Sequence, residues 1–241
     1  MNTMHSPYGF EPVEKCDTCP LRGAGFFCDL SRAALKALEA VKYTTAYPQG
    51  AVLFVEEEDP RGVFVLCKGR VKLSITSSEG KALITRIAGP GEVLGLNAAV
   101  SGKPYELTAE TLEPCQVNFV RRENFVRFLG QHGEASLRAA QQLSSRYRAA
   151  CEQIRSLGMS HSAAARLARF LLDGAGKGHD AKEAARVRMT LTHEQIGQMI
   201  GTSRETVTRT LGEFKDHRLI TQSGSTVVIQ DRAALETLVG V

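Results

Sequence analysis

Residues 190–220 constrain the fold of this chain more than any other stretch, because they indicate two short helices joined by a tight turn. Thr192 suits the N-cap of the first helix, and Gln195 three residues later completes the pattern of a capping box. Gly201 can adopt the positive φ that ends a helix and turns the chain. Either Thr202 or Ser203 can start the second helix, and Thr202 with Glu205 forms another capping-box pattern.

The second predicted helix has an apolar face and a polar face. Val207, Leu211 and Phe214 recur at helical spacing, which predicts that they pack inward. In the major groove of DNA, arginine donates two hydrogen bonds to guanine, and glutamate accepts one from cytosine. The alternative to DNA reading is that Glu205 and Arg209 form an ordinary solvent-exposed ion pair, which stabilises the helix by about 0.3 kcal/mol. The predicted DNA-binding residues lie at the start of this helix and on its polar face: Thr202, Ser203, Arg204, Glu205, Thr208 and Arg209.

The amino-acid sequence of this stretch resembles that of a known family. EQIGQMIGTSRETVTRTLGEFKDHRLI closely resembles the helix-turn-helix of the CRP/FNR family of bacterial transcription regulators, and SRETV-x-R is its most specific part. Arg204, Glu205 and Arg209 match the reading set of the CRP branch, which implies a half-site similar to TGTGA. The resemblance also implies RNA polymerase as a partner. An enzyme is not expected, because the sequence offers no Ser-His-Asp, Cys-His or paired-carboxylate constellation.

The segment from 43 to 120 has a different period, with short β-rich runs separated by Gly, Pro and Ser turns. This spacing predicts a small antiparallel barrel or jelly roll, and closed β-rolls enclose a pocket. A hairpin in LITQSGSTVVIQ after the helix-turn-helix predicts the wing of a winged helix. The strands are expected at 51–55, 62–67, 70–76, 82–87, 106–112 and 116–120.

A long helix is predicted over 134–157, with small and apolar residues at spacings of three and four. This pattern is typical of a coiled-coil seam between two subunits. The alternative is a helix that packs on its own domain. The predicted dimerisation residues are Ala140, Leu143, Tyr147, Ala150, Ile154 and Leu157.

The order of these parts resembles the CRP/FNR plan from Phe10 nearly to the C-terminus. The expected fold is α+β: a β-roll like cyclic-nucleotide-binding domains, a long dimerisation helix and a C-terminal winged helix-turn-helix. A two-fold dimer implies palindromic half-sites one helical turn apart. The expected divisions are a cysteine-containing segment at 1–30, the roll at 31–132, the dimerisation helix at 133–158 and the DNA-binding domain at 159–241.

The family resemblance also allows the pocket of the roll to be compared with that of cyclic-AMP binders. Leu96 stands where those proteins carry a glutamate for the ribose. Glu106 and Leu107 stand where they carry an Arg-Ser pair for the cyclic phosphate. A carboxylate at that place would repel a phosphate, so cyclic AMP is not the expected effector.

The six cysteines need an explanation, because the chain shows neither a signal peptide nor an apolar membrane span. A cytoplasmic location follows as the expectation, and structural disulfides are rare there. Net charge does not help, since +4 permits nucleic-acid binding without arguing for it. Metal binding or redox sensing is therefore the leading interpretation of the thiols.

Four of these cysteines resemble the ligands of FNR-type oxygen sensors, which hold a [4Fe-4S] cluster with three N-terminal cysteines and one from the roll. The matching set is Cys16, Cys19, Cys28 and Cys115. FNR has five residues between its second and third cysteines, whereas eight separate Cys19 from Cys28. Cys67 is interpreted as a buried apolar residue. Structural zinc, thiol redox chemistry, no cofactor and an iron-sulfur electron carrier stay open as alternatives.

Overall fold

The computed structural model describes residues 8, 15, 16, 19, 22, 27–159, 162–175 and 185–240. Most of the predicted N-terminal segment, 1–30, therefore lies outside the described residues. The chain forms two compact units, one of Met1–Gly80 and Ile84–Ala149 and the other of Lys81–Leu83 and Ala150–Val241. Among the helices that the structure describes, none is both long and apolar enough to cross a membrane.

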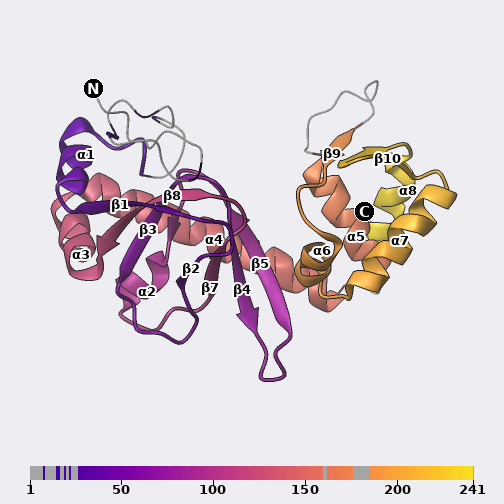
Figure 1. Cartoon of the computed structure of the whole chain (residues 1–241), viewed down its shortest axis with the longest axis horizontal. Coiled ribbons are helices and arrows are strands. Elements are labelled where there is room, and N and C mark those ends of the chain that lie inside the picture. Colours follow the sequence, from indigo (N-terminus) through magenta and orange to yellow (C-terminus); the bar gives the residue numbers. More distant parts are fainter. Residues whose placement is uncertain are drawn as a thin grey trace. The chain divides into compact units, whose positions relative to one another are not determined.

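The first unit contains two four-stranded sheets that form the predicted β-roll (Figure 1). All the strand pairs of the first sheet are antiparallel, as are β2–β7 and β4–β7 in the second. One sheet has the order β1 (Lys42–Tyr47), β8 (Cys115–Arg121), β3 (Gly62–Lys68) and β6 (Val93–Leu94). The other has the order β2 (Val52–Phe54), β7 (Thr108–Thr111), β4 (Val71–Thr76) and β5 (Ala82–Ala88).

Side chains alternate between two cores along β3, as expected for a strand buried on both faces. Val63 and Val65 pack in an outer core with helices α1 (Arg32–Glu39) and α3 (Arg122–Gln131). Phe64 and Leu66 point the other way, into the core inside the roll. Strand β8 alternates in the same manner, so the sheet that β3 and β8 form separates two environments.

Three short elements of the roll were not predicted. Strand β1 is a largely exposed edge strand of sequence KYTTAY, and β6 has only two residues. Helix α2 (Leu96–Ser101) has six residues and no side-chain cap, because Gly95 holds its N-cap position with φ +72°. Elements this short carry little periodicity, and tertiary contacts decide them.

Helix α4 (Gly133–Met159) follows the roll and ends one residue beyond the predicted division at 158. The boundary between the two compact units falls within this helix, between Ala149 and Ala150. Ala135, Ala139 and Gln142 are its buried residues, and the two alanines pack in the outer core of the roll. The N-terminal half of the helix is therefore part of the first unit.

The second unit has the predicted winged helix-turn-helix arrangement, and Leu167, Ile196, Leu211 and Val227 lie in its core. The wing contains the expected hairpin, β10–β11, and a third strand, β9, extends it in the order β10-β11-β9. Its elements are α5 (Ala163–Gly174), β9 (Arg186–Arg188), α6 (His193–Ile200), α7 (Arg204–Asp216), β10 (Ile220–Ser223), β11 (Thr226–Ile229) and α8 (Arg232–Val239).

Candidate functional site

The turn between α6 and α7 is fixed by local hydrogen bonds. The Thr192 hydroxyl accepts from the backbone N–H of Gln195 at 3.2 Å, and the Gln195 side chain accepts from the N–H of Thr192 at 2.9 Å. This confirms the predicted capping box, and Gly201 adopts the predicted positive φ of 65°. Ser203, not Thr202, caps α7 by accepting from the N–H of Thr206 at 3.2 Å.

Arg166 of α5 holds the end of α6 from outside the motif. Its Nε donates to the carbonyl of Ile200 at 2.6 Å, and its Nη2 donates to the carbonyl of Gly201 at 3.5 Å. A cation at a helix C-terminus satisfies carbonyls that lack a partner within the helix and complements the helix dipole. The orientation of the turn is thus set by α5 as well as by its own sequence.

Gly197 allows the two helices to approach each other closely. A Cβ at this position would lie 2.8 Å from the carbonyl oxygen of Thr202 and 3.2 Å from the carbonyl carbon of Ser203. Both neighbours are backbone atoms of the turn, which the caps described above hold in place. The backbone of the turn occupies the space that a side chain at position 197 would fill.

Gly197→Ala is expected to destabilise the protein, although Gly→Ala within a helix ordinarily stabilises by up to about 1 kcal/mol. The matched control is Gly212→Ala in α7, where an added Cβ meets no atom within 4 Å. We expect chemical denaturation to give a lower free energy of unfolding for the first variant and an unchanged or higher one for the second. Stabilisation by both variants would contradict the close approach.

The exposed face of α7 carries the side chains predicted to read DNA. Arg204, Glu205, Thr208 and Arg209 are exposed, as is the capping residue Ser203, while Thr202 is partly buried. The opposite face is buried as predicted, through Val207, Leu211 and Phe214. The N-terminal half of one helix therefore presents a continuous set of hydrogen-bonding groups to solvent.

The polar groups on this face are partly ordered by their neighbours. A backbone hydrogen bond at Glu205 itself and one from the Ser203 hydroxyl hold the pKa of the Glu205 carboxyl below its usual range. The Thr208 hydroxyl donates to the carbonyl of Arg204 at 3.0 Å. Arg209 Nε lies 3.7 Å from Glu213 Oε1, so the arginine faces Glu213 rather than Glu205. Glu205 is left as an ionised acceptor beside the arginine donors, which suits a major groove.

Helix α4 carries an exposed apolar stripe. Tyr147 and Ile154 are 72% and 69% exposed, and Ala140 and Ala150 are also exposed. Leu137, which the predicted seam omitted, is 60% exposed and continues the stripe. Such a stripe on a long helix has the spacing of a coiled-coil seam.

Two residues of the predicted seam lie elsewhere. Leu143 packs against the outer core of the roll and lines its pocket, which is the own-domain alternative that the sequence left open. Leu157 is partly buried, and its Cδ2 would lie 3.0 Å from a Cβ at Gly201. Leu143 therefore does not belong to the exposed stripe, because this side of α4 packs against the roll.

Three of the four predicted cluster ligands lie together in the first unit. Cys16, Cys19 and Cys28 line one cavity under helix α1, and the fourth thiol there belongs to Cys67. The Nδ2 of Asn118 donates to Cys67 Sγ at 3.1 Å. Lys42 Nζ donates to Cys16 Sγ at 3.4 Å. The cavity thus gathers four thiols with an amide and an ammonium group beside them.

Cys115 does not join this cavity. It lies on the inner face of β8 with Val117, in the core inside the roll, and its Sγ donates to the carbonyls of Glu113 at 3.2 Å and Arg70 at 3.4 Å. Cys67 follows Val65 on the outer face of β3, at a register shift between β3 and β8. Strand alternation therefore puts Cys115 and Cys67 on opposite faces of one sheet, and the outer face is the one toward the N-terminal cysteines.

Burial favours the protonated form of the thiols of Cys16, Cys28, Cys67 and Cys115. It raises the pKa of Cys67 to about 12 and that of Cys28 to about 11, with neighbouring thiols adding to both. Burial also raises the pKa of Cys16, which Lys42 partly counteracts, and raises that of Cys115 to about 11. Any metal held here would displace protons, because thiolate is the form of cysteine that ligates metals.

The thiol cavity fits an iron-sulfur centre in donor type, since such clusters bind Cys thiolates. In the structure, however, the side chains that line the cavity nearly fill it. The cavity measures about 20 Å³, which is room for about one water molecule. Among the described residues, no three His, Cys, Asp or Glu side chains are already arranged to hold a metal ion. A cluster would require the thiols to move apart around it.

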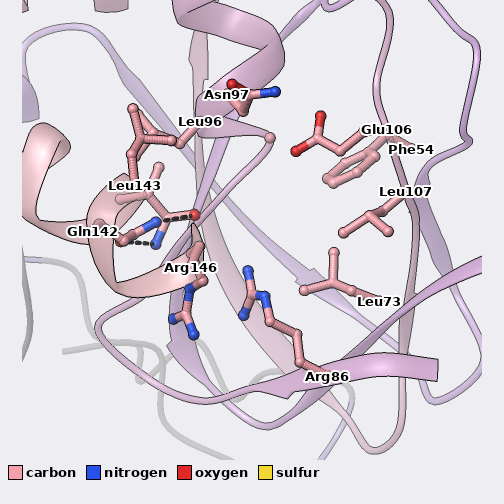
Figure 2. Close-up of a pocket in the computed structure, with 12 residues that line it drawn as sticks. Phe54, Leu73, Arg86, Leu96, Asn97, Glu106, Leu107, Gln142, Leu143 and Arg146 are labelled. Atoms are coloured by element: carbon pink, nitrogen blue, oxygen red, sulfur yellow. Dashed lines mark hydrogen bonds between the residues drawn. The ribbon is translucent and has the colours of Figure 1, made fainter. Parts of the chain in front are cut away.

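A second pocket lies inside the roll (Figure 2) and is closed on one side by α4. Leu96, Glu106 and Leu107 line it, so the three positions compared with cyclic-AMP binders do face a common site. Sequence reasoning missed two further lining residues, Arg86 of β5 and Arg146 of α4. Their guanidinium groups lie side by side at one end, and Glu106 lies toward the other (Figure 2).

Known proteins resemble both units of the chain. Residues 44–132 match the model of a cyclic nucleotide-binding domain, and residues 165–238 match that of a Crp-like helix-turn-helix domain. A CRP-like cAMP-activated global transcriptional regulator of Mycobacterium tuberculosis is 27% identical over 216 residues, which is 89% of this chain and 96% of that protein. The cAMP-activated global transcriptional regulator CRP of Salmonella typhimurium is 26% identical, over 76% of this chain and 87% of that one.

Solved structures share the fold. FixK2 from Bradyrhizobium japonicum superposes with a TM-score of 0.69 at 25% identity, and the match covers 82% of this chain and 97% of that one. At these coverages each match extends over at least part of both the roll and the helix-turn-helix.

Proposed function

We propose that this chain is a DNA-binding transcription regulator of the CRP/FNR family that binds, as a homodimer, a palindromic site with TGTGA-like half-sites. RNA polymerase is the partner that such a regulator would meet at a promoter. The observation that carries the proposal is the exposed face of α7, where Arg204, Glu205 and Arg209 stand together above a fully buried opposite face.

Each group on that face has a matching partner in the major groove. Arg204 and Arg209 supply paired N–H donors for guanine O6 and N7, and Glu205 supplies an acceptor for the amino group of cytosine. Ser203 and Thr202 lie at the N-terminal end of α7, where backbone N–H groups and hydroxyls suit a phosphate. The exposed stripe of α4 supplies the surface on which two copies would pair.

Fluorescence anisotropy with two labelled duplexes tests the proposal. One duplex carries inverted TGTGA half-sites one helical turn apart, and the other has the same composition in scrambled order. At physiological salt we expect the palindrome to bind about 10³-fold more tightly. Equal affinities for the two duplexes over a range of salt concentrations would overturn sequence-specific reading.

A second candidate function, redox or oxygen sensing through a [4Fe-4S] cluster, is favoured by the four thiols that line one cavity. We propose Cys16, Cys19, Cys28 and Cys67 as the ligands, in place of the set that included Cys115. The [4Fe-4S] cluster would supply an oxygen-labile centre bound to these thiolates. Lys42 would compensate negative charge beside Cys16, and Asn118 would donate a hydrogen bond to Cys67.

Anaerobic purification with iron and sulfide analysis tests this candidate, and Cys67→Ser and Cys115→Ser form a matched pair of variants. We expect about four irons and four sulfides per chain in the wild type and in Cys115→Ser, and a large loss in Cys67→Ser. Retention in Cys67→Ser with loss in Cys115→Ser would restore the set expected from sequence. A protein without iron or sulfide after anaerobic reconstitution would exclude the cluster, and bound zinc would indicate a structural site.

A further inference from the structure

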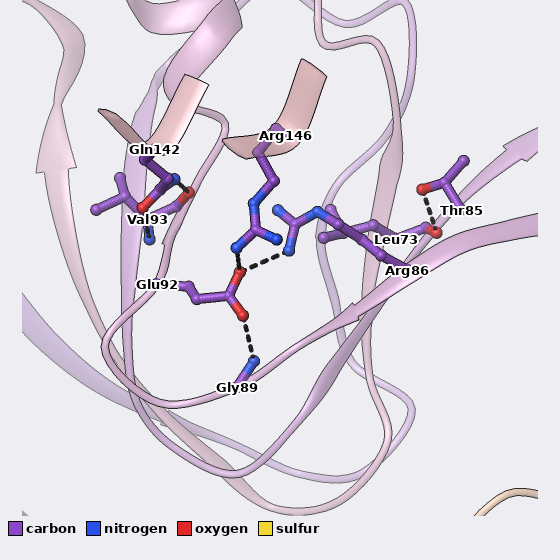
Figure 3. Close-up of polar contacts among 8 residues, drawn as sticks. All are labelled: Leu73, Thr85, Arg86, Gly89, Glu92, Val93, Gln142 and Arg146. Carbon is purple, nitrogen blue, oxygen red and sulfur yellow. Dashed lines mark hydrogen bonds and ion pairs between the residues drawn. The ribbon is translucent and has the colours of Figure 1, made fainter. Parts of the chain in front are cut away.

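Two arginines from distant parts of the chain meet on one carboxylate beside the roll pocket (Figure 3). Arg86 Nη1 lies 2.7 Å from Glu92 Oε2, and Arg146 Nη2 donates to the same oxygen. The other oxygen, Glu92 Oε1, accepts from the backbone N–H of Gly89 at 3.0 Å. The glutamate is thereby fixed in place, and both arginines depend on a single anionic oxygen.

The charges at this cluster do not balance. Arg86, Arg146 and Glu92 are each less than one-third exposed, and two cations face one anion. Burial, followed by repulsion from Arg146, lowers the pKa of Arg86 to about 10. The Nε of Arg146 is buried and donates to no atom of the described residues. These three groups carry one more positive than negative charge, Glu106 also attracts Arg86 from the pocket lining, and Arg146 keeps a free donor.

The two guanidinium groups line a cavity with a defined shape and polarity. It measures about 90 Å³. Phe54, Leu73 and Leu107 form an apolar wall, and Glu106 faces the cavity from the end away from the arginines (Figure 2). An occupant would thus meet cations at one end, hydrocarbon along its length and a carboxylate at the other.

We propose that this pocket binds a small organic carboxylate, with its anionic end on Arg86 and Arg146 and a hydroxyl or amine donor facing Glu106. Arginine pairs hold carboxylates by parallel hydrogen bonds. Glu106 disfavours a second anionic group at the far end, and the apolar wall accepts one ring or a short chain. The cavity as it stands is too small for a nucleotide.

The site is attached to the helix proposed to pair subunits. Gln142 lies one turn before Arg146 in α4, and its side chain donates to the carbonyl of Val93 at 2.7 Å and accepts from the Val93 N–H at 3.2 Å. Gln142 and Arg146 are thus two polar attachments of α4 to the segment at β6. A carboxylate that shares Arg146 with Glu92 weakens the second of them. This consequence rests on the proposed function, whereas ligand binding itself does not.

Isothermal titration calorimetry at constant ionic strength tests the site with 4-hydroxybenzoate, its neutral isostere 4-hydroxybenzamide, and cyclic AMP. A ligand of this size is expected to bind with a Kd of about 1 mM or lower. We expect the amide to bind at least about 10-fold more weakly than the carboxylate, because it offers no anion to the arginines. We expect cyclic AMP to bind as weakly, because the cavity of about 90 Å³ is too small for a nucleotide. Glu106→Ala should weaken the hydroxybenzoate relative to benzoate, because it removes the acceptor for the hydroxyl.

Arg146→Gln should weaken 4-hydroxybenzoate binding about 10-fold or more, whereas Glu92→Gln should strengthen it, because the competing carboxylate is gone. The control is Arg61→Gln, which removes an exposed arginine of the same unit that pairs with Glu58 at 3.7 Å. Thermal melts confirm that each variant is folded. Absence of saturation at about 10 mM, ten times the expected Kd, or equal binding by wild type and Arg146→Gln, would overturn the proposal.

Anisotropy with the palindromic duplex, without added carboxylate, separates this result from DNA reading. Tight DNA binding with no carboxylate binding would overturn the pocket proposal and leave the proposed function standing. Carboxylate binding with no preference for the palindrome would support the pocket proposal and overturn the proposed function.

Discussion

Arg204→Ala is expected to cost about 1–3 kcal/mol for each half-site, so the loss in a dimer–palindrome complex is roughly twice that. The side chain is exposed at the first residue of α7, and the buried face on Val207 and Leu211 keeps the helix in place without it. The loss should concentrate on one guanine of the half-site. Affinity for duplexes changed at that base should become nearly equal to affinity for the original site.

Two further variants distinguish base reading from a general loss of charge. Arg204→Lys keeps the cation but lacks the fork that binds guanine through two hydrogen bonds, so we expect a loss close to that of alanine. Arg232→Ala removes an exposed arginine of α8 that pairs with Glu236, and should leave specificity unchanged. An equal loss by Arg204→Ala on specific and scrambled duplexes would show that the residue contacts only phosphate.

The double variant Tyr147→Glu with Ile154→Glu is expected to be monomeric. These residues are the most exposed large side chains of the apolar stripe on α4, and charges there would face their own copies across a two-fold axis. Because a monomer engages one half-site at a time, affinity for the palindrome should fall by a factor of about 10²–10⁴. Sedimentation velocity gives the mass, and anisotropy gives the affinity.

Ala149→Glu is the matched control for this effect, because Ala149 is exposed on α4 but lies two residues from Tyr147, away from the stripe. It adds one of the two negative charges of the double variant to the same helix and should leave the dimer intact. If the double variant stayed dimeric, subunits would pair through another surface. If the wild type were itself a monomer at micromolar concentration, pairing would depend on DNA or on an effector.

The parts of the fold that sequence predicted well are those whose signals are local. The capping box of Thr192 and Gln195, the turn at Gly201 and the buried face of α7 each depend on residues within a few positions of one another. The long helix and the strands of the roll followed from period alone. The elements that the sequence did not predict are short, such as β1 and α2, and neither their period nor their composition is distinctive.

The ligand set of the thiol cavity could not be decided from spacing. Alternation along β3 and β8 shows that Cys67 shares a face with Val65, and Cys115 with Val117, but it does not say which face the N-terminal cysteines cover. That choice is tertiary, because helix α1 packs its apolar side against the outer face. A buried cysteine on a strand was accordingly interpreted as packing, although it lies against three other thiols.

The arginine cluster was also beyond the reach of sequence. Arg86 and Arg146 are sixty positions apart, and each alone is an ordinary basic residue on a strand or a helix. Only the packing of α4 on the roll brings them to Glu92. The absent cyclic-phosphate residues were visible in the sequence, but the residues that give the pocket its different polarity were not.

The most direct test of the central claim is selection of binding sites by the purified protein from a pool of random duplexes, followed by sequencing. The account predicts enrichment of an inverted repeat of TGTGA-like half-sites, with centres one helical turn apart. The same selection with Arg204→Ala should lose preference at one guanine in each half. Failure to enrich any sequence, or enrichment of a single unrepeated element, would contradict a homodimer that reads DNA through α7.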